Sequence, residues 1–231
     1  MGIISVRYFA QVMHMAIRTD TDDMYSRFID IFNPRLFEKR IAVIGCGATG
    51  SNLIDSLVRM GIKPGLITVF DHDRVREHNL PNTIFTIANV GCKKSIVMGE
   101  KYGVVVKGRF TIRSNLVCYD VIFNCADTMK VRAMVADKLM PHHMLIDCRV
   151  AKYGSQVFTF SGRRVKQYKM TLFPDNEAIP LSCGERMFRP TALVTASLAI
   201  NQLIKLERGE TIDEVISMNV NELSVFKERN L

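Results

Sequence analysis

Several features that would assign this chain to a special class of protein are missing from it. None of its six cysteines forms a CxxC pair, and their irregular spacing in a chain of 231 residues predicts reduced thiols, not a disulfide framework. No apolar run has the length of a signal peptide or a membrane span, and Val6 breaks the N-myristoylation pattern that follows Gly2. The sequence therefore predicts a cytoplasmic protein without a membrane partner.

The charge balance limits the partners in a similar way. Lysine and arginine number 31 against 23 aspartate and glutamate residues, which gives a formal net charge of +8. This excess favours acidic partners such as ATP phosphates. However, the sequence has no basic tract with interleaved aromatic residues, so nucleic acid is not an expected partner. The length predicts an N-terminal segment at 1–21 and one domain at 22–231.

The rest of the chain is organised around the stretch from Arg40 to Asp73. The short apolar run at 41–44 has the pattern of a buried parallel strand, and a GxGxxG sequence follows it at 45–50. A helical pattern comes next, and a second buried strand at 66–70 leads into Asp71. Together these features predict a βαβ unit that carries a nucleotide-binding fingerprint.

The residues of the fingerprint have separate physical roles. We expect Gly45 to allow the tight turn, Gly47 to let a phosphate approach the backbone, and Gly50 to let the helix pack closely on the strand. Ala48 belongs to the helix N-terminus, whose free N–H groups and positive dipole favour an anion. Asp71 is placed to hold a ribose hydroxyl. These features predict a nucleotide site but do not identify the nucleotide.

Strand and helix patterns alternate along the remaining sequence. Helices are expected at 24–32, between 91 and 103, at 129–140 and at 191–206, with a short second helix after Asn33-Pro34. Strands are expected at 104–112, 119–125, 145–150, 154–160 and twice within 212–226, and loops at 75–89 and 163–190. This order predicts an α/β fold: a Rossmann-like, doubly wound, mostly parallel sheet with an antiparallel C-terminal extension.

Polar residues follow the predicted strands or begin the next helix. Asp71, Asp73, Asn79, Lys94 and Asp127 all occupy such positions, which converge on one crevice in an open sheet. Two acids and a lysine suit a metal–phosphate site, with Mg²⁺ on Asp127 and phosphate on Lys94. Taken singly, Asp127 could instead cap the following helix, and Lys94 could be a surface lysine. Taken together, the five residues favour a functional site over these alternatives.

At this point the chain resembles the ThiF/MoeB adenylyltransferases, bacterial relatives of ubiquitin-activating enzymes, over residues 22 to 227. Asp71-His72-Asp73-Arg74-Val75 with His78-Asn79-Leu80 is similar to the family's Asp-x-Asp-x-Val…Ser-Asn-Leu, and Val90-Gly91-Cys92-Lys93-Lys94 to its Val-Gly-x-x-Lys. Asn124-Cys125-Ala126-Asp127 resembles its Asp-Cys-Thr-Asp, Arg132 stands where the family often has arginine, and Gly154 with Gln156 resembles its Gly-Gln strand.

The resemblance implies an enzyme that uses ATP to activate the C-terminal carboxylate of a small ubiquitin-like or sulfur-carrier protein or peptide, releasing pyrophosphate. It implies these roles: Asp71 on ribose, Asp73 on ribose or the metal, Asn79 and Lys94 on phosphates, Asp127 on Mg²⁺, and Asn82 and Thr128 beside the nucleotide. Arg27 would reach the phosphates of the partner subunit in a homodimer. A surface arginine on a helix is an equal alternative for Arg27.

The chain departs from the family pattern at two places. Asn82 stands where the family often has arginine, and the sequence leaves open whether Arg74 or Arg76 compensates. Tyr168 and Thr171 stand where the first of two zinc-binding CxxC pairs would be, so we expect no zinc.

Cys183 falls where some relatives keep a reactive cysteine, and nearby arginines would lower the pKa of its thiol. The other cysteines are interpreted as small buried fillers: Cys46, Cys92, Cys118, Cys125 and Cys148. Two alternative functions stay open. The first is an NAD-dependent oxidoreductase, with Asp71 on the ribose. The second is a module that binds a nucleotide or a ubiquitin-like protein without turnover.

Overall fold

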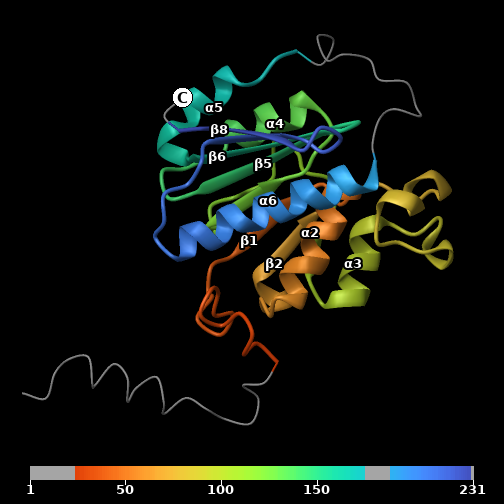
Figure 1. Ribbon diagram of the computed structural model, residues 1–231. Coiled ribbons are helices and arrows are strands. Elements are labelled where there is room, and N and C mark those ends of the chain that lie inside the picture. The colour runs from red at the N-terminus through yellow and green to blue at the C-terminus, as the bar shows by residue number, and fades with distance from the viewer. Residues whose placement is uncertain (1–23, 175–187, 230–231) are drawn as a thin grey trace, which may run out of the picture.

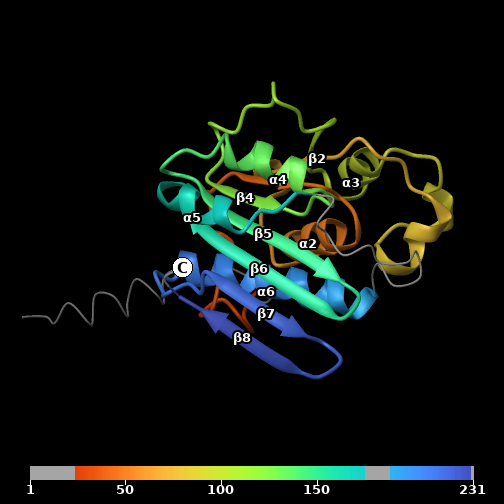
Figure 2. The same cartoon turned by 90° about the horizontal axis from the view of Figure 1, so that it is seen from above.

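An eight-stranded sheet in the order β3-β2-β1-β4-β5-β6-β7-β8 forms the centre of the molecule (Figures 1 and 2). The structure is a computed structural model that describes residues 24–174 and 188–229. Its strands are β1 (Ile41–Ile44), β2 (Ile67–Phe70), β3 (Val105–Lys107), β4 (Val121–Asn124), β5 (Met144–Ala151), β6 (Gly154–Ser161), β7 (Val215–Asn219) and β8 (Ser224–Glu228). The strands from β3 to β5 run parallel, and β6, β7 and β8 continue the sheet antiparallel. The predicted Rossmann-like sheet with an antiparallel C-terminal extension is therefore confirmed.

Helices cover both faces of this sheet (Figure 1). The longer α-helices are α2 (Ala48–Arg59), α3 (Lys94–Tyr102) and α6 (Arg189–Glu207) on one face, with α4 (Met129–Ala136) and α5 (Val165–Met170) on the other. Short 3₁₀ helices are η1 (Pro64–Leu66), η2 (Glu77–Asn82), η3 (Ile87–Asn89) and η4 (Gly162–Arg164). Within the described ranges, no helix combines the length and apolar character that crossing a bilayer requires.

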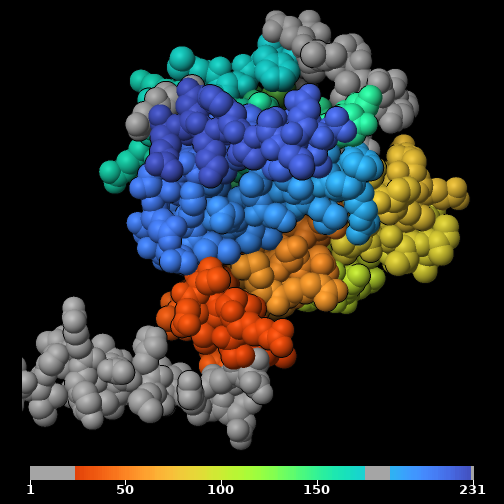
Figure 3. Space-filling view, in the orientation of Figure 1, coloured from red at the N-terminus to blue at the C-terminus, as the bar shows by residue number. Residues whose placement is uncertain are grey.

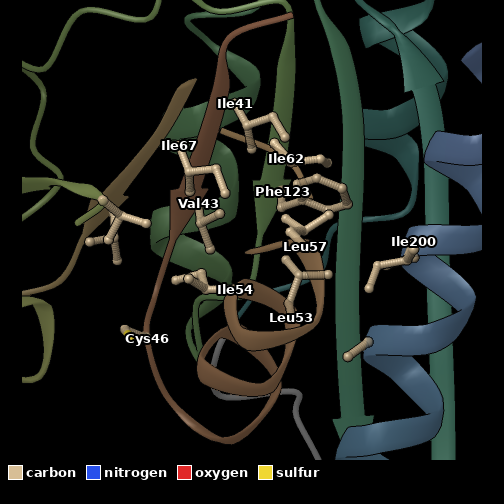
Figure 4. Close-up of a cluster of buried hydrophobic side chains, with 14 of the residues drawn as sticks. Ile41, Val43, Cys46, Leu53, Ile54, Leu57, Ile62, Ile67, Phe123 and Ile200 are labelled. Atoms are coloured by element: carbon tan, nitrogen blue, oxygen red, sulfur yellow. The ribbon is translucent and has the colours of Figure 1, made fainter. Parts of the chain in front are cut away.

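Strand alternation divides the core into two apolar clusters. On β1, Ile41 and Val43 face the α2 side, whereas Ala42 and Ile44 face the α4 side. Figure 4 shows Leu57 of α2 among the side chains packed on the first of these faces. A fully buried Leu or Ile side chain contributes about 1.5–3 kcal/mol, so this packing fixes the strand ends that carry the polar residues.

Some predicted elements are shorter than expected or of a different kind. Residues 24–31 form consecutive turns and not a helix, and the second helix expected after Asn33-Pro34 is also a turn. So short a segment nucleates a helix poorly without a large buried face. Helix α4 ends at Ala136 and not near Met140, because residues 137 and 138 form a turn. The strand expected at 104–112 covers only 105–107, because Gly108 offers no side chain to pack.

The prediction of a loop across 163–190 is wrong for its first part. Residues 165–170 form α5, although their sequence is mostly polar. Tyr168 anchors this helix, because its side chain is fully buried against Phe160 with 5.9 Å between the ring centroids. One aromatic anchor thus overrides a weak apolar pattern.

Candidate functional site

The glycine loop between β1 and α2 is closed on two sides and open on a third. Gly45 has a φ of +92°, and a Cβ there would lie 2.6 Å from the Cys125 carbonyl oxygen. A Cβ at Gly50 would lie 2.0 Å from the Gly45 carbonyl oxygen. A Cβ at Gly47 would have no neighbour within 4 Å. The loop is therefore packed tightly against β4 and α2, and its backbone at Gly47 faces free space.

Asp71, at the end of β2, fastens this loop to the sheet. Its buried carboxylate accepts hydrogen bonds from the backbone N–H of Cys46 at 2.6 Å and of Asp73 at 2.7 Å. Two carboxylate oxygens offer about four lone-pair sites, so acceptors remain for ribose hydroxyls. The residue thus positions the loop and keeps the capacity that its predicted ribose role requires.

The N-terminus of α2 offers donors without a side-chain cap. Its N-cap residue is Gly47, which makes no side-chain cap hydrogen bond, and the first turn contains no acidic residue. The first N–H groups of a helix lack carbonyl partners within it, and the helix dipole adds positive charge there. The open space at Gly47 and these donors together fit a phosphate group.

A short backbone pairing places Lys94 beside Asp73. The Val75 N–H donates to the Cys92 carbonyl at 2.9 Å, and the Lys94 N–H donates to the Asp73 carbonyl at 2.8 Å. The Lys94 ammonium then lies 3.2 Å from an Asp73 carboxylate oxygen, with side-chain exposures of 10% and 54%. The alternative of a surface lysine is wrong, because Lys94 is buried and its charge faces the strand edge.

The loop after β2 also forms a hydrogen bond with α2, the helix that follows the glycine loop. The Asn52 amide group donates to the Ala48 carbonyl at 2.6 Å and to the Asn82 carbonyl at 3.1 Å. In the same loop, Asn79 Oδ1 accepts the Arg76 N–H at 3.0 Å. Asn82 is therefore held beside α2 through Asn52, and Asn79 lies in the same short helix η2; their place beside a nucleotide stays a prediction.

Asp127 and Thr128 follow β4, the strand on the other side of β1. Thr128 is the N-cap of α4, and its hydroxyl accepts the Val131 N–H at 3.4 Å. Asp127 is exposed and makes no hydrogen bond or ion pair within the described part of the chain. The alternative in which Asp127 caps α4 is wrong, and its carboxylate points to solvent at the strand edge.

Next to Asp127 lies a buried ionic cluster of Arg132, Asp147 and Arg149, of which the resemblance indicated only Arg132. Arg132 forms an ion pair with Asp147, and its guanidinium donates to the carbonyls of Ala126 at 2.5 Å and Cys148 at 3.0 Å. Arg149 binds the same aspartate at 2.8 Å. This cluster fixes the residue before Asp127. The available signal was two opposite charges inside the apolar strand pattern at 145–150.

Tyr168 and Thr171, which stand where the family has its first zinc-binding CxxC pair, lie next to this cluster. The Thr171 carbonyl and hydroxyl each accept an Arg149 guanidinium hydrogen bond at 2.8 Å. Burial, assisted by Asp147, raises the pKa of the Tyr168 hydroxyl well above its ordinary value. Packing and hydrogen bonding occupy both side chains, which is consistent with their not being metal ligands. The absence of zinc stays a prediction.

The cysteines differ in their surroundings. Cys46 and Cys148 are buried, and burial raises the pKa of the Cys46 thiol well above its ordinary value. Cys92 and Cys118 are exposed, so their interpretation as buried fillers is wrong. Cys125 is half-buried. Cys183, the predicted nucleophile, lies outside the described residues, as does the 1–21 segment.

A cavity of about 510 Å³ opens beside the end of β2. Its lining includes Phe70, Lys107, Arg109 and Tyr119. Phe70 and Tyr119 belong to the apolar cluster on the α4 side of the sheet, and none of the predicted site residues lines the cavity. Its size is in the range of small-molecule sites.

Arg27 is not brought to the other predicted residues of its own chain. Two residues before it, Tyr25 packs against Gly61, where an added Cβ would lie 2.6 Å from the tyrosine ring. Gly61 follows the C-terminus of α2, and twelve helical residues span about 18 Å. Figure 1 shows the segment before β1 at the end of α2 opposite the 75–90 loop. Within one chain, therefore, Arg27 lies far from the glycine loop.

Comparisons with known proteins match this architecture. The sequence model of the ThiF family matches residues 23–230. The ATP-dependent ubiquitin transferase-like protein Cap2 of Vibrio cholerae is 31% identical over 134 residues, which are 52% of this chain and 23% of Cap2. The adenylyltransferase and sulfurtransferase UBA4 of Yarrowia lipolytica is 33% identical over 113 residues, 44% of this chain and 28% of UBA4. The matched part thus spans about a quarter of each of these relatives.

Solved structures match over more of the chain. Escherichia coli MccB, in a crystal structure with AMPCPP and selenomethionyl MccA, superposes with a TM-score of 0.67 at 16% identity, covering 91% of this chain and 72% of MccB. PaaA superposes with a TM-score of 0.66 at 14% identity, covering 98% of this chain and 83% of PaaA. At such low identity the likeness concerns the fold.

Proposed function

Because the chain belongs to the ThiF family, we propose that it is an ATP-dependent adenylyltransferase that activates the C-terminal carboxylate of a small protein or peptide. The observation that carries the proposal is the loop at Gly47, which faces open space at an uncapped helix N-terminus and is fastened to a strand-end aspartate. The buried Lys94 beside the same strand end adds a cation for phosphate. A dehydrogenase would need neither Lys94 nor Asp127.

The reaction is a displacement at the α-phosphorus of ATP. An oxygen of the acceptor carboxylate forms a bond to this phosphorus, the bond to the bridging oxygen breaks, and pyrophosphate leaves. Such chemistry depends on positioning and on neutralising charge more than on a strong base. In this chain the α2 N-terminus would bind phosphate oxygens, and Asp71 would hold the ribose.

A divalent cation fits the donor chemistry at the strand edge. Asp127 would hold Mg²⁺, because its carboxylate is exposed and makes no bond within the described residues. Asp73 would support the ion or the ribose from β2, where the carboxylates of Asp71 and Asp73 and the His72 ring offer ligand atoms within 4.8 Å of one another. Mg²⁺ would supply charge neutralisation at the phosphates.

The acceptor is proposed to be a ubiquitin-like protein, a sulfur-carrier protein or a peptide. Support comes from relatives: two matched proteins are named ubiquitin-like modifier-activating enzyme 5, and MccB has been solved with MccA. A reactive role for Cys183, which would take the activated acyl group as a thioester, stays part of this proposal.

The active protein is proposed to be a homodimer. Arg27 lies at the amino end of the sheet in its own chain, so it can act at a glycine loop only if that loop belongs to a partner. Asn79, Asn82 and Thr128 complete the set of proposed nucleotide neighbours within one chain.

The proposal is tested by exchange of labelled pyrophosphate into ATP with candidate acceptors that carry a free C-terminus. Calorimetry with ATP–Mg²⁺ and with NAD separates the alternatives. Acceptor-dependent exchange supports the adenylyltransferase, whereas ATP binding without exchange for any acceptor would indicate the non-catalytic module. Micromolar NAD affinity without ATP affinity would indicate the oxidoreductase and refute the proposal.

A further inference from the structure

Arg189, the first residue of α6, reaches across to the loop that follows β2. One guanidinium nitrogen, Nη1, donates to the Thr83 carbonyl at 2.7 Å and to the Pro81 carbonyl at 3.3 Å. These two carbonyls flank Asn82. Figure 3 shows the same proximity at the surface, where the start of α6 meets the yellow segment around residue 80.

Asn82 connects this guanidinium to the glycine loop. Its carbonyl accepts a hydrogen bond from Asn52, and Asn52 also binds the carbonyl of Ala48, the first residue of α2. The sequence of contacts from Arg189 to the first turn of α2 is therefore short. It passes only through backbone carbonyls and one amide side chain, none of which carries charge.

Within residues 24–174 and 188–229, the charge of Arg189 has no acidic partner. Its only hydrogen-bond partners among the described residues are neutral carbonyls, and it has no ion pair there. Lys94 and Arg132, by contrast, both lie against aspartates. A guanidinium has five N–H donors, and the bonds that Arg189 makes to other described residues use only its Nη1.

We infer that Arg189 binds the phosphates of the nucleotide and supplies from α6 the cation that the 77–82 loop lacks at Asn82. The inference rests on the proposed nucleotide site. Arg74, the alternative cation, donates instead to the Gly91 carbonyl at 2.6 Å, on the segment that carries Lys94. Arg189 is bound on both sides of position 82, where the resemblance implies an arginine.

The test compares Arg189→Gln, Arg74→Gln and a control, Arg163→Gln, by calorimetry with ATP–Mg²⁺ and with adenosine. Glutamine keeps an N–H donor for the carbonyls and removes the charge. A charge-assisted contact predicts about a tenfold to hundredfold loss of ATP affinity in Arg189→Gln, with adenosine affinity unchanged. The exposed Arg163 should show no change with either ligand.

A second variant separates phosphate binding from support of the loop. Adding Asn82→Arg to Arg189→Gln should restore most of the ATP affinity, because it returns a guanidinium to the same place. Equal losses for ATP and adenosine, no loss at all, or a wild-type protein without ATP affinity would overturn the inference. ATP binding that depends on Arg189, without pyrophosphate exchange, would refute the adenylyltransferase and leave the inference standing.

Discussion

The Arg132–Asp147–Arg149 cluster is closed to solvent, whereas Asp73 and Asp127 are exposed beyond β2 and β4, the two strands that flank β1, and the buried Lys94 pairs with Asp73. Side-chain exposures in the closed cluster are 6%, 0% and 10%. At the edge, Asp73 is 54% exposed and Asp127 is also exposed. In the closed cluster each charge has a fixed partner, and in the open set Asp127 has none among the described residues.

This difference separates the charges that maintain the fold from those that can bind a ligand. Removing one partner of a buried ion pair strongly destabilises the protein, because the other charge stays buried and unpaired. Removing an exposed carboxylate costs the folded protein little stability. Such a carboxylate can exchange its bound water for a metal ion, including one that is bound to phosphate. The Ala126 carbonyl, held by Arg132, lies between the two kinds of site.

The largest expected effect is on the closed cluster. Asp147→Ala leaves the guanidinium groups of Arg132 and Arg149 without their shared carboxylate, so the free energy of unfolding should fall by about 3–5 kcal/mol. Chemical denaturation measures this loss. Asp137→Ala is the matched control, because its exposed pair with Lys169 should contribute no more than about 1 kcal/mol. Equal losses in the two variants would show that burial does not distinguish them.

The next effect concerns catalysis at the open edge. Asp127→Ala should lower the rate of pyrophosphate exchange by about a hundredfold to a thousandfold, because charge at the phosphates is no longer neutralised. The free energy of unfolding should change by less than about 0.5 kcal/mol, since Asp127 is exposed. Unchanged exchange, measured against magnesium concentration, would refute the metal role.

A smaller effect is expected at the open face of the glycine loop. Gly47→Ala adds a Cβ that would meet no neighbour within 4 Å, but Gly47 has a ψ of −149°, outside the regions that alanine favours, so the free energy of unfolding should fall by about 1 kcal/mol. The same methyl group would occupy the space predicted for a phosphate, and ATP affinity should drop about tenfold by calorimetry. Gly65→Ala, which also meets no neighbour, is the control. Full ATP affinity in Gly47→Ala would place the phosphate elsewhere.

Much of the fold follows from patterns visible in the sequence. Short apolar runs such as 41–44 predict buried parallel strands, and the fingerprint with Asp71 predicts the loop that the structure shows. The strand end before Gly108 depends on one glycine, and no sequence pattern marks the end of α4 at Ala136. Helix α5 was missed because Tyr168 is its only buried residue.

Residues joined across the fold were harder to predict. Arg189 lies 106 residues from Thr83, and Asp147 gathers two arginines from different elements. Such contacts depend on the arrangement of the elements in space, which no local pattern records. By contrast, Lys94 was found because it stands at the start of a helix after a strand end.

The last prediction asks whether the open edge is completed by a second subunit. Arg27→Ala and Asp127→Ala chains should each be inactive in exchange, because each lacks one group of the proposed composite site. After random subunit exchange, an equal mixture should recover about a quarter of the wild-type activity, since half of the dimers are hybrids with one intact site. A mixture that exchanges subunits but stays inactive, or an active monomer by sedimentation, would contradict a role in trans. If Arg27 served its own chain, the mixture would recover no activity, because every protomer in it lacks either Arg27 or Asp127.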